Sequence, residues 1–241
     1  MTGAFLLALK KPAGGVRPIA CGDVIRHLSS KLMLGRVLPV VTPKLVPAQL
    51  GISVSAAIEV LFHKVSDQIA SALPDGCSFL LLDLKNAFNV IDHDYIRKAI
   101  QNYAPALLRW FLWCYASPSK LSFELSSQQG VQQGDPLGTL LFALGIHDCV
   151  LAVQNHAGVL WSGWYADDGT IQAPLPILNE VVAALSTSLA ECNVSINSLK
   201  TKVVCLNTGA IDSFVHVRSF RRVSLLPCRF SWPCFGCSSR C

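Results

Sequence analysis

Hydrophobic residues along the chain alternate between helical spacing and short apolar runs. Asp23 precedes a stretch with helical spacing, and we expect it to be the N-cap of that helix. Prolines at 39, 43 and 47 are expected to end this helix, because proline lacks the donor that a helix interior needs. A second helical pattern covers residues 53–72. The first quarter of the chain is therefore predicted to be mainly helical, after a short extended segment at 16–20.

An apolar run at 79–84 has the length and composition of a strand buried on both faces. Asp83 is its single charge. A lone carboxylate in such a strand is costly, so we expect Asp83 at the strand end, facing a cation or a network of donors.

The segment 159–171 predicts a hairpin whose tip carries Asp167 and Asp168. Gly169 is expected to supply the positive φ that tight hairpin turns require. Taken alone, two acids before a glycine are more typical of a solvated turn than of a site.

The remaining elements follow from the same patterns. Asp92 is a predicted helix cap, and Asp135 followed by Pro136 is typical of a helix start. Helices are predicted at 92–103, 107–115, 140–153 and 178–192, and strands at 121–125, 194–197 and 203–206. Because strands and helices both occur, with the strands short, the predicted fold class is α+β.

Composition narrows the protein class. The chain has 241 residues, of which 51% are hydrophobic and 15% charged, which excludes a disordered chain and indicates a large buried core. The net charge of +5 permits a polyanionic partner without requiring one. Apolar runs are too short to span a bilayer, and the N-terminus lacks the basic start of a secretory signal. We therefore expect an intracellular protein without a membrane segment, with reduced cysteines in its core.

Residues 207–241 differ in composition from the rest of the chain: they are rich in arginine and contain four of the ten cysteines. Cys234 and Cys237 form a Cys-x-x-Cys pair, but the cysteine spacing matches no zinc ligand set.

Three carboxylates could converge at one edge of the predicted sheet: Asp83, Asp167 and Asp168. Such a group would hold two Mg²⁺ ions about 3.5 to 4 Å apart, which activate an attacking hydroxyl and stabilise a leaving pyrophosphate. This chemistry explains why acids should lie beside apolar strands.

Five segments in a fixed order make the pattern specific. They are Arg17-Pro18-Ile19, Asp83 to Asn89, Gln133-Gly134-Asp135-Pro136-Leu137, Tyr165-Ala166-Asp167-Asp168 and Asn197 to Lys202. Over residues 10–206 the chain resembles a reverse transcriptase of the type found in retrotransposons without long terminal repeats, the LINE-like elements.

The resemblance implies a role for each matching residue. Asp83 and Asp167 would be the principal metal ligands, with Asp168 beside them as a further acid. Lys200 would be a catalytic residue that protonates pyrophosphate. Phe88 would crowd a ribose 2′-hydroxyl and so favour deoxynucleotides. The implied nucleotide-binding residues are Arg17, Lys11, Phe88, Gln133 and Gly134.

The resemblance also implies cofactors, partners and subdomains. Two Mg²⁺ ions, with Mn²⁺ as an alternative, would act on an RNA template, a DNA primer and deoxynucleoside triphosphates. We expect a partial fingers subdomain at 1–75, a polymerase palm at 76–206 and an atypical tail at 207–241, with the thumb missing. Two alternatives stay open: an inactive retroelement remnant that at most binds nucleic acid, and an RNA-dependent RNA polymerase. Oligomeric state is not predicted.

Overall fold

A four-stranded antiparallel sheet organises the larger part of the molecule. The computed structural model describes residues 4–10, 14, 16–70, 77–120 and 126–205. The strand order is β6-β7-β3-β8, and every neighbouring pair is antiparallel. These strands are β3 (Cys77–Asp83), β6 (Trp161–Tyr165), β7 (Asp168–Pro174) and β8 (Lys202–Cys205). The α+β fold class is confirmed.

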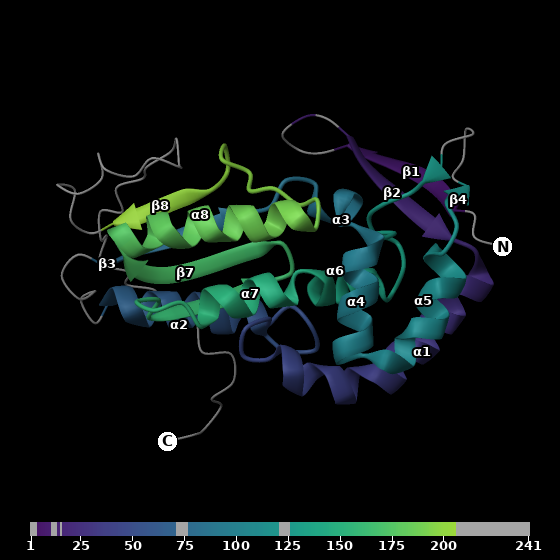
Figure 1. The fold of residues 1–241 in the computed structure, drawn as a ribbon, viewed down its shortest axis with the longest axis horizontal. Coiled ribbons are helices and arrows are strands. Elements are labelled where there is room, and N and C mark those ends of the chain that lie inside the picture. Colours follow the sequence, from purple (N-terminus) through teal and green to yellow (C-terminus); the bar gives the residue numbers. More distant parts are fainter. Residues whose placement is uncertain (1–3, 11–13, 15, 71–76, 121–125, 206–241) are drawn as a thin grey trace, which may run out of the picture.

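Helices cover one face of this sheet (Figure 1). α8 (Leu175–Glu191) packs on β3 and β7, and α7 (His147–Gln154) packs against α8 and β6. Side chains alternate along β3: Leu80 and Leu82 are buried in the main core, whereas Leu81 is 38% exposed. The face that carries Leu81 is therefore open to solvent near this strand's end.

The apolar stretch predicted as one helix at 140–153 is two helices. α6 (Gly138–Gly145) ends at Gly145, and Ile146 separates it from α7. α6 packs on α4 (His93–Tyr103), and Gly145 lies so close to Ile91 and Ile96 that an added Cβ would come within 2.6 Å of the Ile91 side chain. Glycine permits this contact and also weakens the helix at its end.

α1 (Val24–Leu45) continues through two of the prolines that were expected to end it. Pro39 and Pro43 lie on its exposed side, whereas Val37, Val41 and Leu45 on the other side are buried in the core. Burial of that apolar stripe stabilises the helix, although each proline removes one backbone donor from it.

Other boundaries agree with the prediction or differ for local reasons. Asp23 and Asp92 cap α1 and α4 as predicted, each accepting backbone N–H bonds. α2 (Ala57–Ala70) begins four residues later than predicted, after Ser53 and Ala56 adopt positive φ angles of 57° and 54°. The prediction of a strand at 194–197 is wrong, because only an isolated bridge between Ile196 and Leu84 forms there. The strand predicted at 121–125 lies outside the described residues.

A separate hairpin lies beside the helical end of the molecule in Figure 1. Its strands are β1 (Ala4–Lys10) and β2 (Val16–Gly22), paired antiparallel throughout. The smaller elements are α3 (Ala87–Val90), the 3-10 helix η1 (Pro105–Leu107), α5 (Leu108–Tyr115), β4 (Ser119–Lys120) and β5 (Ser126–Ser127). No helix within the described ranges is long and apolar enough to cross a membrane. The free cysteines recorded there are Cys21, which is half-buried, and the buried Cys77, Cys114, Cys149 and Cys192.

Candidate active site

Two predicted acids meet across the central strands. β3 ends at Asp83, and the strand register places it opposite Asp168, the first residue of β7. Directly opposed residues of an antiparallel pair share a face of the sheet, with Cβ atoms about 4.5 to 5.5 Å apart. Both carboxylates therefore lie on the open face, in line with Leu81 and Thr170. The prediction that Asp83 lies at a strand end is confirmed.

The third acid lies on the turn between β6 and β7. Ala166 and Asp167 form a two-residue connection, and Ala166 has a φ of 54°. The prediction that Gly169 supplies the positive φ is wrong, because Gly169 is a strand residue. Its missing side chain instead leaves room for the indole of Trp164, which a Cβ would approach within 2.9 Å.

A short segment after α8 supplies the donors that face Asp83. Lys200 Nζ lies 3.1 Å from Asp83 Oδ1, and Asn197 Nδ2 donates to Asp83 Oδ2 at 2.7 Å. The Asp83 backbone is held as well, since Asn197 N donates to the Asp83 carbonyl at 2.8 Å and Asp83 N donates to Thr201 Oγ1 at 3.3 Å. The prediction that Asp83 faces a cation and donors is confirmed.

The sequence places Asn197 and Thr201 in the 197–202 motif but predicts no role for either side chain. An asparagine and a threonine near a lysine have no distinctive pattern, so the signal that could have identified them is their register. The bridge between Leu84 and Ile196 places their segment beside the end of β3.

The surroundings of Asp168 raise the pKa of its carboxyl. Loss of hydration around its carboxyl is the largest cause that raises its pKa, although the residue as a whole is exposed; the neighbouring Asp167 and Asp83 carboxylates raise the pKa further. The Lys200 ammonium acts in the opposite direction. The two neighbouring carboxylates and the Lys200 ammonium thus act on the Asp168 carboxyl in opposite directions, and a bound cation would favour its charged form.

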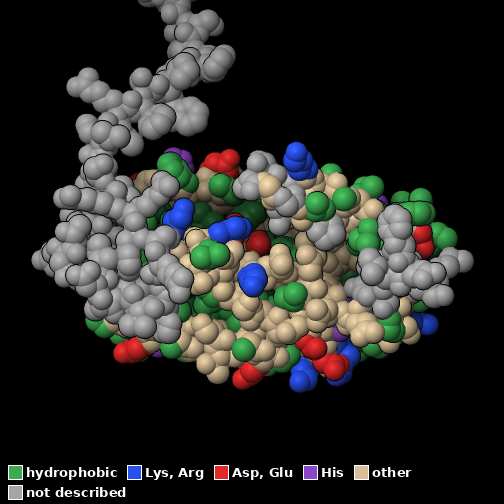
Figure 2. All heavy atoms as spheres, turned by 90° about the horizontal axis from the view of Figure 1, so that it is seen from above, with side chains coloured by type: hydrophobic (Ala, Val, Ile, Leu, Met, Phe, Trp, Pro, Cys, Tyr) green, Lys and Arg blue, Asp and Glu red, His purple; other side chains and the backbone are tan. Residues whose placement is uncertain are grey.

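Two cavities adjoin these acids. One, of about 280 Å³, is lined by Asp83, Asp167, Phe88, Gln133 and Lys200, among others. The other, of about 440 Å³, lies over the open sheet face and is lined by residues of β3, β7 and β8 together with Lys200. Seen from above in Figure 2, the surface is hollowed near its centre, with an acidic side chain inside the hollow and Lys or Arg side chains close by.

Phe88 and Gln133 are both held where they line the smaller cavity. The Phe88 ring stacks on Phe142, with ring centroids 4.3 Å apart and an interplanar angle of 26°. Gln133 Nε2 donates to Asn89 Oδ1 at 3.3 Å. The structure therefore brings together five of the predicted residues: Asp83, Asp167, Phe88, Gln133 and Lys200.

The other predicted nucleotide-binding residues are placed differently. Gly134 approaches β2 rather than the cavity, since its N–H donates to the Ala20 carbonyl at 3.2 Å and a Cβ would come within 2.7 Å of that oxygen. Arg17 belongs to β2, next to the cavity-lining Val16, but its side chain is outside the description. Lys11 lies outside the described residues.

This geometry does not test the metal prediction. Within the residues that the structure describes, no group of three or more His, Cys, Asp or Glu side chains is arranged to hold one ion together. The carboxylate oxygens of these acids are ligands of the kind that hard divalent cations prefer. The three-carboxylate metal site stays a prediction.

Sequence relatives of the chain are proteins of retroelements. It is 29% identical over 227 residues to the retrotransposable element SLACS 132 kDa protein of Trypanosoma brucei gambiense, covering 89% of this chain and 19% of that protein. It is 26% identical over 218 residues to a probable RNA-directed DNA polymerase from transposon X-element of Drosophila melanogaster, covering 81% of this chain and 24% of that protein. The chain thus spans about a fifth to a quarter of these relatives.

Solved structures and a family model agree with these relatives. Apo telomerase from Candida tropicalis, truncated from its C-terminal domain, superposes with a TM-score of 0.59 at 12% identity over 87% of this chain and 51% of that one. Telomerase from Candida albicans, in complex with a fragment of telomeric RNA, gives a TM-score of 0.58 at 12% identity over 86% and 42% of the two chains. At such identity the likeness shows the fold alone. The model of the family described as reverse transcriptase (RNA-dependent DNA polymerase) matches residues 9–229. The chain belongs to this family, as a reverse transcriptase domain of the retroelement kind.

Proposed function

We propose that this chain catalyses RNA-templated extension of a DNA primer by deoxynucleoside triphosphates. The observation that carries the proposal is the meeting of Asp83 and Lys200 with Asp167, Phe88 and Gln133 around one cavity. Residues from four separate segments converge there, which a solvated hairpin tip would not require.

In the reaction, the primer 3′-hydroxyl loses its proton to solvent and its oxygen attacks the α-phosphorus of the triphosphate. A new P–O bond forms as the bond from the α-phosphorus to the bridging oxygen breaks, and pyrophosphate leaves with that oxygen. Asp83 and Asp167 would hold two Mg²⁺ ions, or Mn²⁺, with Asp168 beside them. When bound, these ions lower the pKa of the hydroxyl and neutralise charge on the phosphates.

Other residues would act directly on the nucleotide. Lys200, which is 68% exposed at its side chain and can move from Asp83, would donate a proton to the leaving pyrophosphate. Phe88, fixed by Phe142, would crowd a ribose 2′-hydroxyl, and the Gln133 amide would hydrogen-bond the nucleotide or template. The assignment of residues 1–75 to fingers, 76–206 to a palm and 207–241 to a distinct tail belongs to the same proposal.

Primer extension tests the proposal. Purified chain is given primed poly(rA), dTTP and Mg²⁺, beside Asp167→Ala and the matched control Asp94→Asn, which removes an exposed carboxylate on α4. We expect extension by the wild type and by Asp94→Asn and none by Asp167→Ala. Extension no greater than that of Asp167→Ala contradicts the enzymatic proposal, and template binding without extension then supports an inactive remnant. Preference for UTP over dTTP supports an RNA polymerase instead.

A further inference from the structure

The first half of α1 is oriented against its own hydrophobic pattern. Val24, Ile25 and Leu28 are 74%, 59% and 56% exposed, whereas Arg26 and Ser30 are buried, at 1% and 0% exposure. Burying a guanidinium costs more hydration free energy than an ion pair reliably returns, so stability alone is a weak explanation for this arrangement. A role for the Arg26 charge has to come from what it holds.

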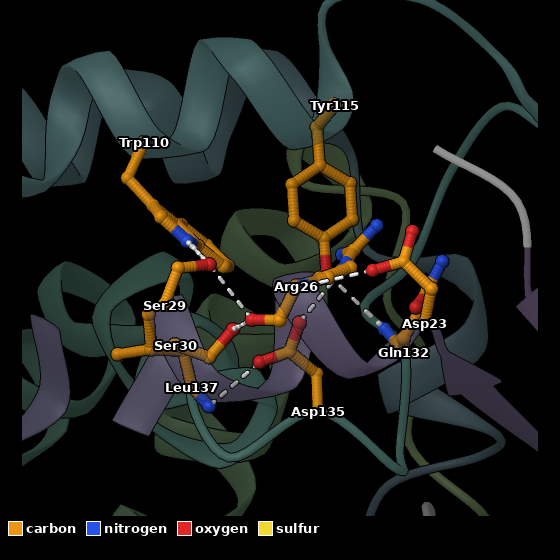
Figure 3. A network of polar contacts seen from close by, with 9 residues as sticks. All are labelled: Asp23, Arg26, Ser29, Ser30, Trp110, Tyr115, Gln132, Asp135 and Leu137. Atoms are coloured by element: carbon orange, nitrogen blue, oxygen red, sulfur yellow. Dashed lines mark hydrogen bonds and ion pairs between the residues drawn. The ribbon is translucent and has the colours of Figure 1, made fainter. Parts of the chain in front are cut away.

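Arg26 is enclosed by an acid and two rings (Figure 3). Its Nε donates to Asp135 Oδ2 at 2.8 Å, and both side chains are 1% exposed. Its guanidinium carbon lies 4.8 Å from the centre of the Tyr115 ring and 5.9 Å from that of Trp110. A planar guanidinium suits this enclosure, because it can stack on rings and still donate in its own plane.

Asp135, which is held by Arg26, also forms hydrogen bonds within its own loop, residues 132–135. Asp135 Oδ1 accepts a hydrogen bond from Leu137 N at 2.9 Å, and Asp135 N donates to the Gln132 carbonyl at 3.0 Å. Gln132 N in turn donates to Tyr115 Oη at 3.3 Å, and Gly134 N donates to Ala20 O. The loop 132–135 is therefore held on both sides of Gln133.

Gln133 is the member of this loop that reaches the smaller cavity, which it lines together with Asp83 and Asp167. We propose that Arg26 is a positioning residue for nucleotide binding: through Asp135 and Tyr115 it holds the loop 132–135 so that Gln133 faces the nucleotide. This inference rests on the proposed function, since it takes that cavity as the nucleotide site. Arg26 itself does not line the cavity.

A kinetic cycle tests the positioning role. Arg26→Lys keeps the charge but loses the planar fork, and we expect its KM for dTTP on primed poly(rA) to rise about 10-fold with kcat within about twofold. Gln133→Ala should raise KM similarly, and the double variant should raise it no further, because Arg26 acts through Gln133. Fully additive increases, or a fall in kcat and thermal stability at unchanged KM, would overturn the proposal.

A second measurement is independent of activity. Hydrogen–deuterium exchange of the amides at 132–137 is followed in Arg26→Met/Asp135→Asn, which removes both charges, leaves neither one buried without its partner and keeps an oxygen that can accept the Leu137 N–H. The matched control is Arg97→Met, which removes an exposed i,i+3 ion pair on α4. We expect exchange at least about 10-fold faster in the loop of the double variant alone, and unchanged exchange overturns the proposal. If the wild type extends no primer, the proposed function fails while this arm still decides whether Arg26 holds the loop.

Discussion

Two carboxylates of this domain each pair with a cation, and their surroundings could hardly differ more. Asp135 and Arg26 are both 1% exposed at their side chains, whereas Asp83 is 20% and its partner Lys200 is 68% exposed. The N···O distances are similar, at 2.8 and 3.1 Å. The two pairs therefore differ in exposure rather than in contact distance. Lys200 is free to leave Asp83, which can then bind another cation, whereas Arg26 is enclosed and stays with Asp135.

The largest expected effect on primer extension comes from the exposed pair, Asp83 and Lys200. Asp83→Asn should lower primer extension by about 10³-fold, because an amide cannot supply the charge that holds divalent cations and organises the reaction. The free energy of unfolding should change by less than about 1 kcal/mol, since the pair is partly solvated. Steady-state extension and thermal melting of the same preparations check both, and a large loss of stability would place Asp83 in the same class as Asp135.

For the buried pair, Arg26 and Asp135, the main expected effect is a loss of stability. Asp135→Asn leaves the Arg26 charge buried without its anion, which typically costs about 3 kcal/mol or more. In a domain of this size that lowers Tm by roughly 6 to 12 °C. Thermal melting beside Asp94→Asn measures it, and a shift no larger than that of this exposed control would contradict the distinction drawn between the pairs.

Asn197 sharpens the comparison within the open region. Asn197→Leu removes the 2.7 Å bond to Asp83 Oδ2, so that the carboxylate keeps only its pairing with Lys200 among the side-chain donors that the structure describes. Partners that orient metal ligands are typically worth about 10- to 100-fold in metal affinity or activity. We expect the Mg²⁺ concentration for half-maximal extension to rise by about 10-fold, and an unchanged Mg²⁺ dependence would show that Lys200 and Thr201 hold Asp83 without it.

The smallest effect concerns Asp168 and pH. Its pKa is raised above the ordinary 3.8 in the folded chain, so the folded state binds more protons than the unfolded state, and stability falls as pH rises through that window. Asp168→Asn should therefore melt about 1 to 2 °C higher than the wild type at neutral pH. The difference should vanish below the ordinary pKa, and a variant that melts lower at neutral pH would contradict the charge balance described for the site.

Sequence reasoning succeeded where one residue's cost was evident locally. A charge at the end of an apolar strand must find donors, and Asp83 does. It failed where a distant contact decides the outcome. Gly169 is required by the indole of Trp164 rather than by the turn, and α1 continues past Pro39 because its opposite side is buried.

Contacts between residues far apart in the sequence could not be predicted from it. Arg26 and Asp135 are 109 positions apart, and no period or motif connects them. The exposed Val24, Ile25 and Leu28 moreover suggest the wrong inner face for α1. The role of Asn197 depends on the position of its segment beside the end of β3, which only the folded chain provides.

The most direct test of the account is to locate the metal ions without relying on turnover. Fe²⁺ can take the place of Mg²⁺ at oxygen-rich sites, and with ascorbate and peroxide it generates radicals that cut the backbone beside it. We predict cuts near residues 83 and 167–168 that Mg²⁺ suppresses, that disappear in Asp83→Asn and Asp167→Ala, and that persist in Asp94→Asn. Cleavage elsewhere in the chain, or cuts that survive the loss of either acid, would contradict the claim that these carboxylates form the metal site of a polymerase.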